Sequence, residues 1–359
     1  MLHRASAGLI VFVLVFALGG CSGTETPTDF QGNRKLVLEA VADRLIVPGY
    51  TLLEQRADTL AQAVTAFSAT PDQVHLNAAR IAWTNALLAW ERVTSYDFGP
   101  AETTFGSLNT DIATFPTSVD KIEAAIAAGD TSTQDFDRDK RGFFALDYLL
   151  FADNSQPLTN ADSVKRRAYM VAVAEHLHGN VAVVKTAWTS YRAEFIERNG
   201  TDAGSSMSLL FNAMNISYEQ AKNFKVALPA GRRVGQTVPA PNAVEAYYSG
   251  VSIRALKAHM NTVIELWEGN EPTIKSFKFY LSPSPGGERL IQDTRTQMDS
   301  LQLALDAFSE NERLSDLIVA NDPRIDDLVE HTQKMSRFLK SELSSILGIA
   351  ITYSSGDGD

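Results

Sequence analysis

Apolar residues recur every three or four positions along most of this chain, and polar residues fill the positions between them. That period places the apolar side chains on one face of a helix. The alternating pattern typical of β-strands is nearly absent. The pattern therefore predicts an all-α protein, with helices over residues 34–47, 50–68, 71–94, 118–128, 136–152, 160–198, 207–225, 242–268, 284–309 and 322–347.

Breaks in the pattern set the predicted ends of the helices and of the domains. Pro48 predicts a kink or a restart, and Thr70 with Pro71 predicts the cap and first turn of another helix. The small and polar residues 199–206 interrupt the pattern near the middle of the chain. Length and this break together predict two side-by-side helical bundles with a site at their interface, over residues 34–200 and 201–350.

The N-terminus follows a different pattern, that of a signal peptide over residues 1–20. A short positive start precedes an apolar stretch at 8–18, which is too short for an ordinary spanning helix. Leu18-Gly19-Gly20-Cys21 matches the lipobox of bacterial lipoproteins, in which the cysteine becomes the first mature residue and carries the lipid. The alternative is a plain secretory signal followed by a chance cysteine.

A lipid on Cys21 would fix the location of the protein. The chain would be anchored at the cell envelope of a Gram-negative bacterium, and Ser22 in place of an aspartate favours the outer membrane. Because Cys21 is the only cysteine, the exported part has no disulfide. Residues 21–33 are predicted as a polar tether and residues 351–359 as a frayed tail. No other segment is long and apolar enough to predict a spanning helix.

The charge balance excludes one class of partner. The chain has 43 acidic and 32 basic residues, a formal net charge of -11. Nucleic-acid binding requires a basic face that can neutralise phosphates, so a nucleic-acid partner is not expected.

One helix is predicted to be buried on all sides. The segment Arg141-Gly142-Phe143-Phe144-Ala145-Leu146-Asp147-Tyr148-Leu149-Leu150-Phe151 is apolar around a single carboxylate. A buried carboxylate is costly unless a partner compensates it. Asp147 therefore either pairs with a group such as Arg141 or marks a functional site.

This segment resembles the signature of the imelysin family, usually read as Arg-Gly-x-His-Ala-x-Glu-Tyr-Leu-Leu. Four other stretches are similar to family elements in the same order: Trp83 through Phe98-Gly99-Pro100, residues 111–116 (Asp-Ile-Ala-Thr-Phe-Pro), Leu228-Pro229, and residues 244–249 (Val-Glu-Ala-Tyr-Tyr-Ser). These envelope proteins were once described as insulin-cleaving metallopeptidases. The resemblance implies two helical bundles with a shared site between them and a role near iron or haem uptake.

The departures from the signature change the expected chemistry. Phe144 stands at the histidine position and Asp147 at the glutamate position, three residues apart on one helical face. Phenylalanine can neither bind a metal nor transfer a proton. His259 aligns with a family asparagine. A hydrolytic metal site needs about three protein ligands and a water, and the sequence shows no such set, so we predict no metal ligands and no catalytic residues.

Five residues are candidates for binding a ligand, each with a simpler alternative. Gly142 allows close helix contact or leaves room for a ligand, and Phe144 is a core residue or a stacking surface. Asp147 is an ion-pair partner or a site residue. Glu245 either stabilises the start of its helix or faces the cleft, and His259 is a hydrogen-bonded histidine or a ligand.

A separate group of cations, Lys222, Lys225, Arg232 and Arg233, is interpreted as a solvated patch. The leading functional prediction is a non-catalytic binding or accessory lipoprotein that serves iron or haem acquisition. Its cofactor is unassigned, with iron or haem as a possible ligand, and its expected partners are the membrane and iron- or haem-uptake components. The alternatives are a metallopeptidase of the imelysin type and a purely structural or interaction lipoprotein.

Overall fold

The computed structural model of the chain describes residues 28–103, 106–134, 136–152, 157–270 and 272–352. The predicted signal peptide at 1–20, Cys21, most of the tether and most of the tail lie outside the described residues. Helix α1 (Thr28–Val41) includes the last residues of the predicted tether, which are therefore helical.

Most of the described part of the chain is helical and almost none of it is strand, which confirms the all-α prediction. The exception is a short antiparallel pair, β1 (Glu102–Thr103) and β2 (Gly106–Ser107), with Glu102 opposite Ser107. This pair lies in a region that the sequence leaves without a predicted helix.

The first group of helices is built around α2 (Val47–Ala69), which packs against α3 (Gln73–Glu91) and α7 (Val164–Glu197). From Tyr50 to Phe67 its buried residues recur every three or four positions, with Leu60 and Ala61 adjacent, as expected for one face of a helix. Pro48 lies in the first turn of α2, directly after a π-helical segment (Ala42–Ile46), so the predicted restart takes the form of a π-helical turn. The remaining helices of this group are α4 (Leu108–Ile112), α5 (Val119–Ala128) and α6 (Gly142–Phe151).

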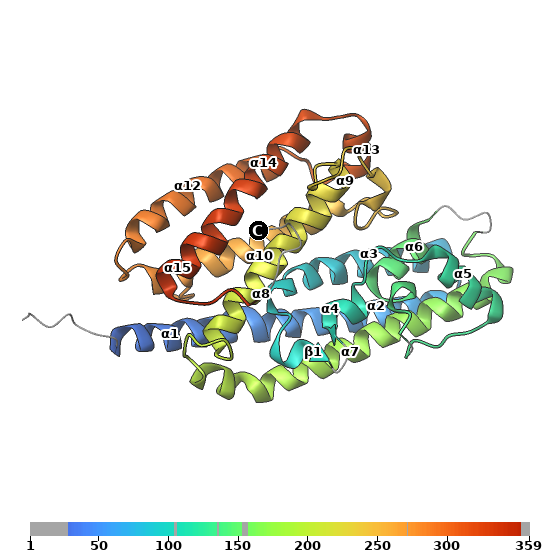
Figure 1. Ribbon diagram of the computed structural model, residues 1–359. Coiled ribbons are helices and arrows are strands. Elements are labelled where there is room, and N and C mark those ends of the chain that lie inside the picture. Colours follow the sequence, from blue (N-terminus) through green and yellow to red (C-terminus); the bar gives the residue numbers. More distant parts are fainter. Residues whose placement is uncertain (1–27, 104–105, 135, 153–156, 271, 353–359) are drawn as a thin grey trace, which may run out of the picture.

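The second group follows a turn at residues 198–205. It contains α8 (Ser206–Gln220), a π-helical segment (Ala221–Ala227), α9 (Leu228–Ala230), α10 (Ser252–Glu268), α11 (Phe277–Leu281), α12 (Gly287–Asp306), α13 (Leu314–Val319), α14 (Pro323–Arg337), a π-helical segment (Phe338–Glu342) and α15 (Leu343–Leu347). Figure 1 shows α12, α14 and α15 on one side of the molecule and α2, α3 and α7 on the other, with α8 and α10 between them.

Helix α10 begins later than predicted, and the reason lies in the backbone. The sequence predicts a helix from residue 242, but residues 241–251 form a short 3₁₀ turn and a series of tight turns. Ala246 and Gly250 have φ values of +54° and +75°, which a right-handed helix cannot contain. This irregular segment lies against α6 and carries one of the candidate residues, Glu245.

Candidate functional site

Helix α6 is buried on all sides, as predicted: every residue from Gly142 to Leu150 is buried. Its carboxylate does not pair with Arg141, because Arg141 binds Asp111 at 2.6 Å. Instead, Asp147 accepts hydrogen bonds from the backbone N–H groups of Tyr248 and Ser249, each at 3.0 Å. Asp147 therefore holds the irregular segment before α10 against the first group of helices.

The environment of Asp147 makes stability depend on pH. Burial raises the pKa of Asp147 to about 6, against the opposing effect of the hydrogen bonds from Ser249 and Tyr248. The folded protein thus keeps a proton that the unfolded chain releases between about pH 4 and pH 6. The stability that Asp147 contributes is complete below about pH 4 and is lost as the pH rises through 6.

Urea unfolding of the wild type and of Asp147→Asn between pH 4 and pH 7.5 checks this expectation. The wild type should lose about 2–3 kcal/mol of unfolding free energy relative to the variant over that range. A difference that stays constant with pH would contradict the assigned titration, whatever its size.

Gly142 and Phe144 shape the chain segment opposite α6. Gly142 has a φ of +80°, and a Cβ there would overlap the backbone of Ile112. The Phe144 ring packs edge-on against Phe115, with ring centroids 5.2 Å apart and an interplanar angle of 71°. Both residues act on the 112–116 segment rather than on a ligand directly, because Phe144 itself is 2% exposed.

A cluster of charged residues lies buried where α3, α10 and the π-helical segment at 221–227 meet. Lys225 Nζ lies 2.7 and 2.6 Å from the two carboxylate oxygens of Glu91 and 2.7 Å from Glu245 Oε2. His259 Nδ1 lies 3.0 Å from Glu91 Oε2, and its Nε2 lies 2.7 Å from Ser217 Oγ. Glu91 is 0% and His259 1% exposed, so this side of the ion network is shielded from water.

The charges in this cluster affect one another. Burial raises the pKa of Glu91, but the charge of Lys225 and the contact with His259 more than offset that and leave the Glu91 pKa lowered. Burial and Lys225 lower the pKa of His259, so its ring is neutral at pH 7. Ionised Glu91 can only accept, so the His259 proton is assigned to Nδ1. Nε2 then accepts from the Ser217 hydroxyl at 2.7 Å, and the Ser217 carbonyl oxygen, 3.0 Å away, receives no proton from the neutral ring.

Glu245 differs from Glu91 although both contact the same lysine. Burial raises the pKa of Glu245 to about 7, and the nearby charge of Glu91 adds to this effect, while Lys225 opposes it. Lys225 makes two contacts with Glu91 and one with Glu245. Lys225 therefore compensates Glu91 more completely than Glu245.

A cavity of about 400 Å³ adjoins this cluster. Most of the cavity surface is apolar, and its charged residues, Lys225 and Glu245, contact each other. The lining residues are Trp90, Thr94, Asn109, Thr110, Ala113, Thr114, Phe115, Pro116, Gln220, Phe224, Lys225, Leu228, Ala243, Glu245 and His259. The volume is within the range of small-molecule sites. Of the five candidates from the sequence, Glu245 and His259 line this cavity, whereas Gly142, Phe144 and Asp147 support it.

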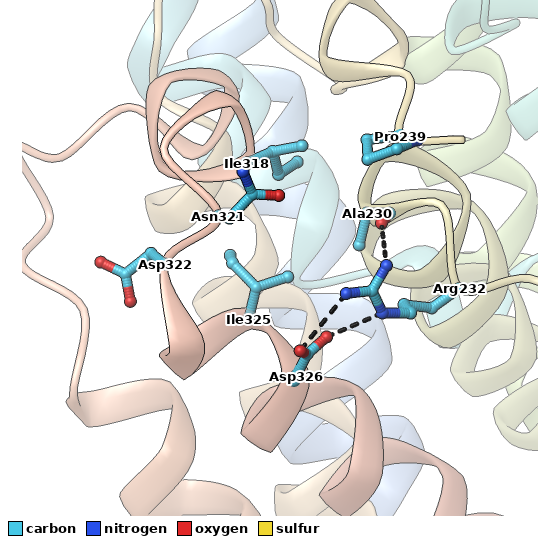
Figure 2. Close-up of a pocket in the computed structure, with 8 residues that line it drawn as sticks. All are labelled: Ala230, Arg232, Pro239, Ile318, Asn321, Asp322, Ile325 and Asp326. Carbon is cyan, nitrogen blue, oxygen red and sulfur yellow. Dashed lines mark hydrogen bonds and ion pairs between the residues drawn. The ribbon is translucent and has the colours of Figure 1, made fainter. Parts of the chain in front are cut away.

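A second hollow, between α9 and α14, is a weaker candidate. Its volume is about 40 Å³, enough for a few water molecules. Figure 2 shows that Arg232 already binds Asp326 and the carbonyl oxygen of Ala230 there. This arrangement leaves little for a ligand to contact.

Sequence reasoning missed the centre of the cluster. Lys222 and Lys225 are buried, so their interpretation as part of a solvated patch was wrong; Lys222 pairs with Glu219 at 2.7 Å. Glu91 was not among the predicted site residues, because a single acidic residue near the end of a helix is common. The available signal was its position directly after the buried Trp90, on the apolar face of α3.

Residues 46–342 match the model of the imelysin family. The chain belongs to this family. The imelysin-family protein is 26% identical over 195 residues to "Iron-regulated protein A" of Synechococcus elongatus, a match that covers 51% of this chain and 52% of that protein. It therefore spans about half the length of this curated relative.

Two solved structures have the same fold as this imelysin-family protein. An imelysin-like protein from Psychrobacter arcticum has a TM-score of 0.72 at 19% identity, covering 90% of this chain and 98% of that one. A putative iron-regulated protein A precursor from Parabacteroides distasonis has a TM-score of 0.75 at 19% identity, covering 90% and 97%. At this identity the likeness shows the fold alone. In the part of the chain that the structure describes, no helix is both long and apolar enough to cross a membrane.

The metal implied by a metallopeptidase does not fit the residues present. Across the described ranges, no three or more His, Cys, Asp or Glu side chains are placed to hold a metal ion. At the signature position the Phe144 ring packs against Phe115 and Asp147 binds backbone N–H groups. In the buried cluster the ammonium of Lys225 occupies the space between the two carboxylates, where a metal ion would have to lie.

Proposed function

We propose that this imelysin-family protein is a ligand-binding component rather than a hydrolase, and that the cavity beside Glu245 is its binding site. The observation that carries the proposal is the closed ion network at the cavity wall. Glu91, Lys225 and His259 satisfy one another, so none of them is free to act as a nucleophile or to bind a metal. What remains is a mostly apolar cavity with few polar groups, the common form of a small-molecule site.

The iron link and the location are separate parts of this proposal. The names of the Synechococcus and Parabacteroides proteins support a link to iron regulation, and the lipobox ending at Cys21 supports a lipid anchor at the cell envelope. We do not propose that His259 ligates haem directly, because each of its ring nitrogens already has a hydrogen-bond partner. Iron depletion should raise the amount of protein in the membrane fraction, and Cys21→Ser should remove it from that fraction.

Filling the cavity tests the binding role. The full-length protein should bind N-phenyl-1-naphthylamine, an uncharged probe that fluoresces in apolar surroundings, with one site per chain. Ala243 lines the cavity, so Ala243→Phe should weaken this binding at least about tenfold by occupying the space with its ring. The readout is a fluorescence titration.

Ala78→Phe is the matched control, since Ala78 is exposed on α3 roughly 18 Å along the helix from the lining residue Trp90. This control should bind the probe as the wild type does. Equal binding by wild type and Ala243→Phe, or no binding by either, would overturn the proposal.

A hydrolase is the second candidate, because the pKa of Glu245 near 7 would suit a general acid or base. Stoichiometric zinc that survives dialysis, together with peptide cleavage that a chelator abolishes, would support this candidate and contradict the binding role.

A further inference from the structure

The chemical class of the ligand can be inferred from the groups that the cavity leaves available. Its apolar wall includes the rings of Trp90, Phe115 and Phe224, together with Pro116 and Leu228. Such a wall favours a ligand with an apolar or aromatic body. The polar head of that ligand must then match the charged part of the wall.

The cavity offers no available cation. Lys225 is the only positively charged residue among those that line it. An ammonium has three N–H donors, and Lys225 Nζ already lies within 2.7 Å of three carboxylate oxygens, two of Glu91 and one of Glu245. An anionic ligand would have to displace one of these carboxylates, so carboxylates and phosphates are poor ligands for this site.

Glu245, by contrast, has capacity to accept a hydrogen bond. Its side chain is 15% exposed, and Lys225 Nζ lies 2.7 Å from its Oε2. A carboxylate has about four lone-pair sites that can accept hydrogen bonds, so one lysine contact leaves sites for a ligand. Among the described residues, no group other than the Lys225 ammonium is hydrogen-bonded or ion-paired with its carboxylate. The charge balance of the cluster also favours a positively charged ligand. Glu91 and Glu245 together carry two negative charges when ionised, while Lys225 supplies one positive charge and His259 is neutral.

We infer that the cavity binds an amphiphilic organic cation, with its apolar body against the aromatic wall and its ammonium or guanidinium nitrogen donating to Glu245. This inference rests on the proposed function, which makes the cavity the ligand site. The cation supplies the positive charge that the cluster lacks and a second donor to the Glu245 carboxylate. Burial and the neighbouring charge of Glu91 raise the pKa of Glu245 to about 7, so a proton competes with the cation for this carboxylate.

The binding should therefore depend on pH. The groups that face Glu245 are Lys225 from the π-helical segment, Glu91 from α3 and His259 from α10; Lys225 and Glu91 keep their charge and His259 stays neutral between pH 7 and pH 8. Below pH 7 a proton competes with the ligand at Glu245, so affinity for a cation should fall by about tenfold per pH unit. Above pH 7 the affinity for the cation should become independent of pH.

Three probes with the same phenyl body and different heads test the inference by isothermal titration calorimetry. These are 2-phenylethylammonium, 2-phenylethanol and 3-phenylpropionate. At pH 8 the ammonium should bind at least about tenfold more tightly than the alcohol, which is the gain expected from one charge-assisted hydrogen bond. The carboxylate should bind more weakly than either.

Glu245→Gln should remove the preference for the ammonium and its dependence on pH, while 2-phenylethanol binding is unchanged. Glu265→Gln is the matched control, because Glu265 is exposed on α10 and does not line the cavity. Thermal unfolding of both variants checks that they fold. Equal binding of ammonium and alcohol by the wild type, tighter binding of the carboxylate, or an ammonium preference that survives Glu245→Gln would each overturn the inference.

These outcomes separate the inference from the proposed function. If the alcohol or N-phenyl-1-naphthylamine binds in the cavity without any preference for the ammonium, the binding role stands and the cationic class is wrong. If no probe binds and Ala243→Phe changes nothing, both are wrong.

Discussion

Replacing Lys225 with methionine is expected to lower the free energy of unfolding by about 3–5 kcal/mol, the usual cost of removing one partner from a buried ion pair. Methionine has nearly the length of the lysine stem, so the loss comes mainly from charge rather than from packing. Glu91, which is 0% exposed, would then be left with His259 as its main partner. The pKa of Glu91 should rise as a result, because burial is no longer offset by Lys225.

Urea unfolding followed by tryptophan fluorescence measures this effect. The double variant Lys225→Met with Glu91→Gln should recover part of the loss, since it no longer buries an uncompensated charge. Lys35→Met is the control, because the ion pair of Lys35 with Glu197 is exposed and should leave stability nearly unchanged. A Lys225→Met protein as stable as the wild type would mean that the network does not stabilise the fold.

The helices could be predicted from the sequence because their cause is local. The burial of α6 follows from the apolar residues on every side of Asp147. The existence of α3 was also predicted, but its cap is Asp72, which accepts from His75 N–H, and not Thr70 as predicted. The membership of the imelysin family was likewise visible in short motifs. Each of these signals lies within about a dozen neighbouring residues, which is the range over which periodicity and capping act.

The partners of the buried charges could not be predicted in the same way. Glu91 and Lys225 are 134 positions apart, and the π-helical segment that carries Lys225 has no marker in the sequence. Asp147 binds backbone N–H groups, which every residue except proline offers. Sequence reasoning therefore identified Asp147 as a carboxylate that needs a partner, but proposed Arg141 because it considered side chains alone.

Glu245 shows how a wrong helix boundary changes the role expected of a candidate residue. With the helix predicted from residue 242, Glu245 would stabilise a helix start. The left-handed backbone at Ala246 and Gly250 delays α10 to Ser252, and Glu245 instead points to Lys225 at the cavity wall. Alanine has no particular preference for this conformation, so the sequence gives no warning at Ala246.

Substitution of Gly142 by alanine is the second change expected to have a large effect, a loss of roughly 2–5 kcal/mol of unfolding free energy. One part is the left-handed backbone, with a φ of +80°, which costs a residue with a Cβ about 1–2 kcal/mol. The other part is the overlap of that Cβ with the carbonyl group of Ile112. Because this is backbone, the 112–116 segment must move, and Ala113, Phe115 and Pro116 line the cavity.

Gly142→Ala should therefore reduce both the urea midpoint and the affinity for N-phenyl-1-naphthylamine, whereas a defect in stability alone would leave the affinity of the folded protein unchanged. Gly179→Ala is the matched control: Gly179 is exposed within α7, and a Cβ there would meet nothing within 4 Å. The control should keep its affinity and gain about 0.5–1 kcal/mol, because alanine is the better helix former. Should both variants behave alike, neither the positive φ of Gly142 nor its contact with Ile112 would be what positions the cavity wall.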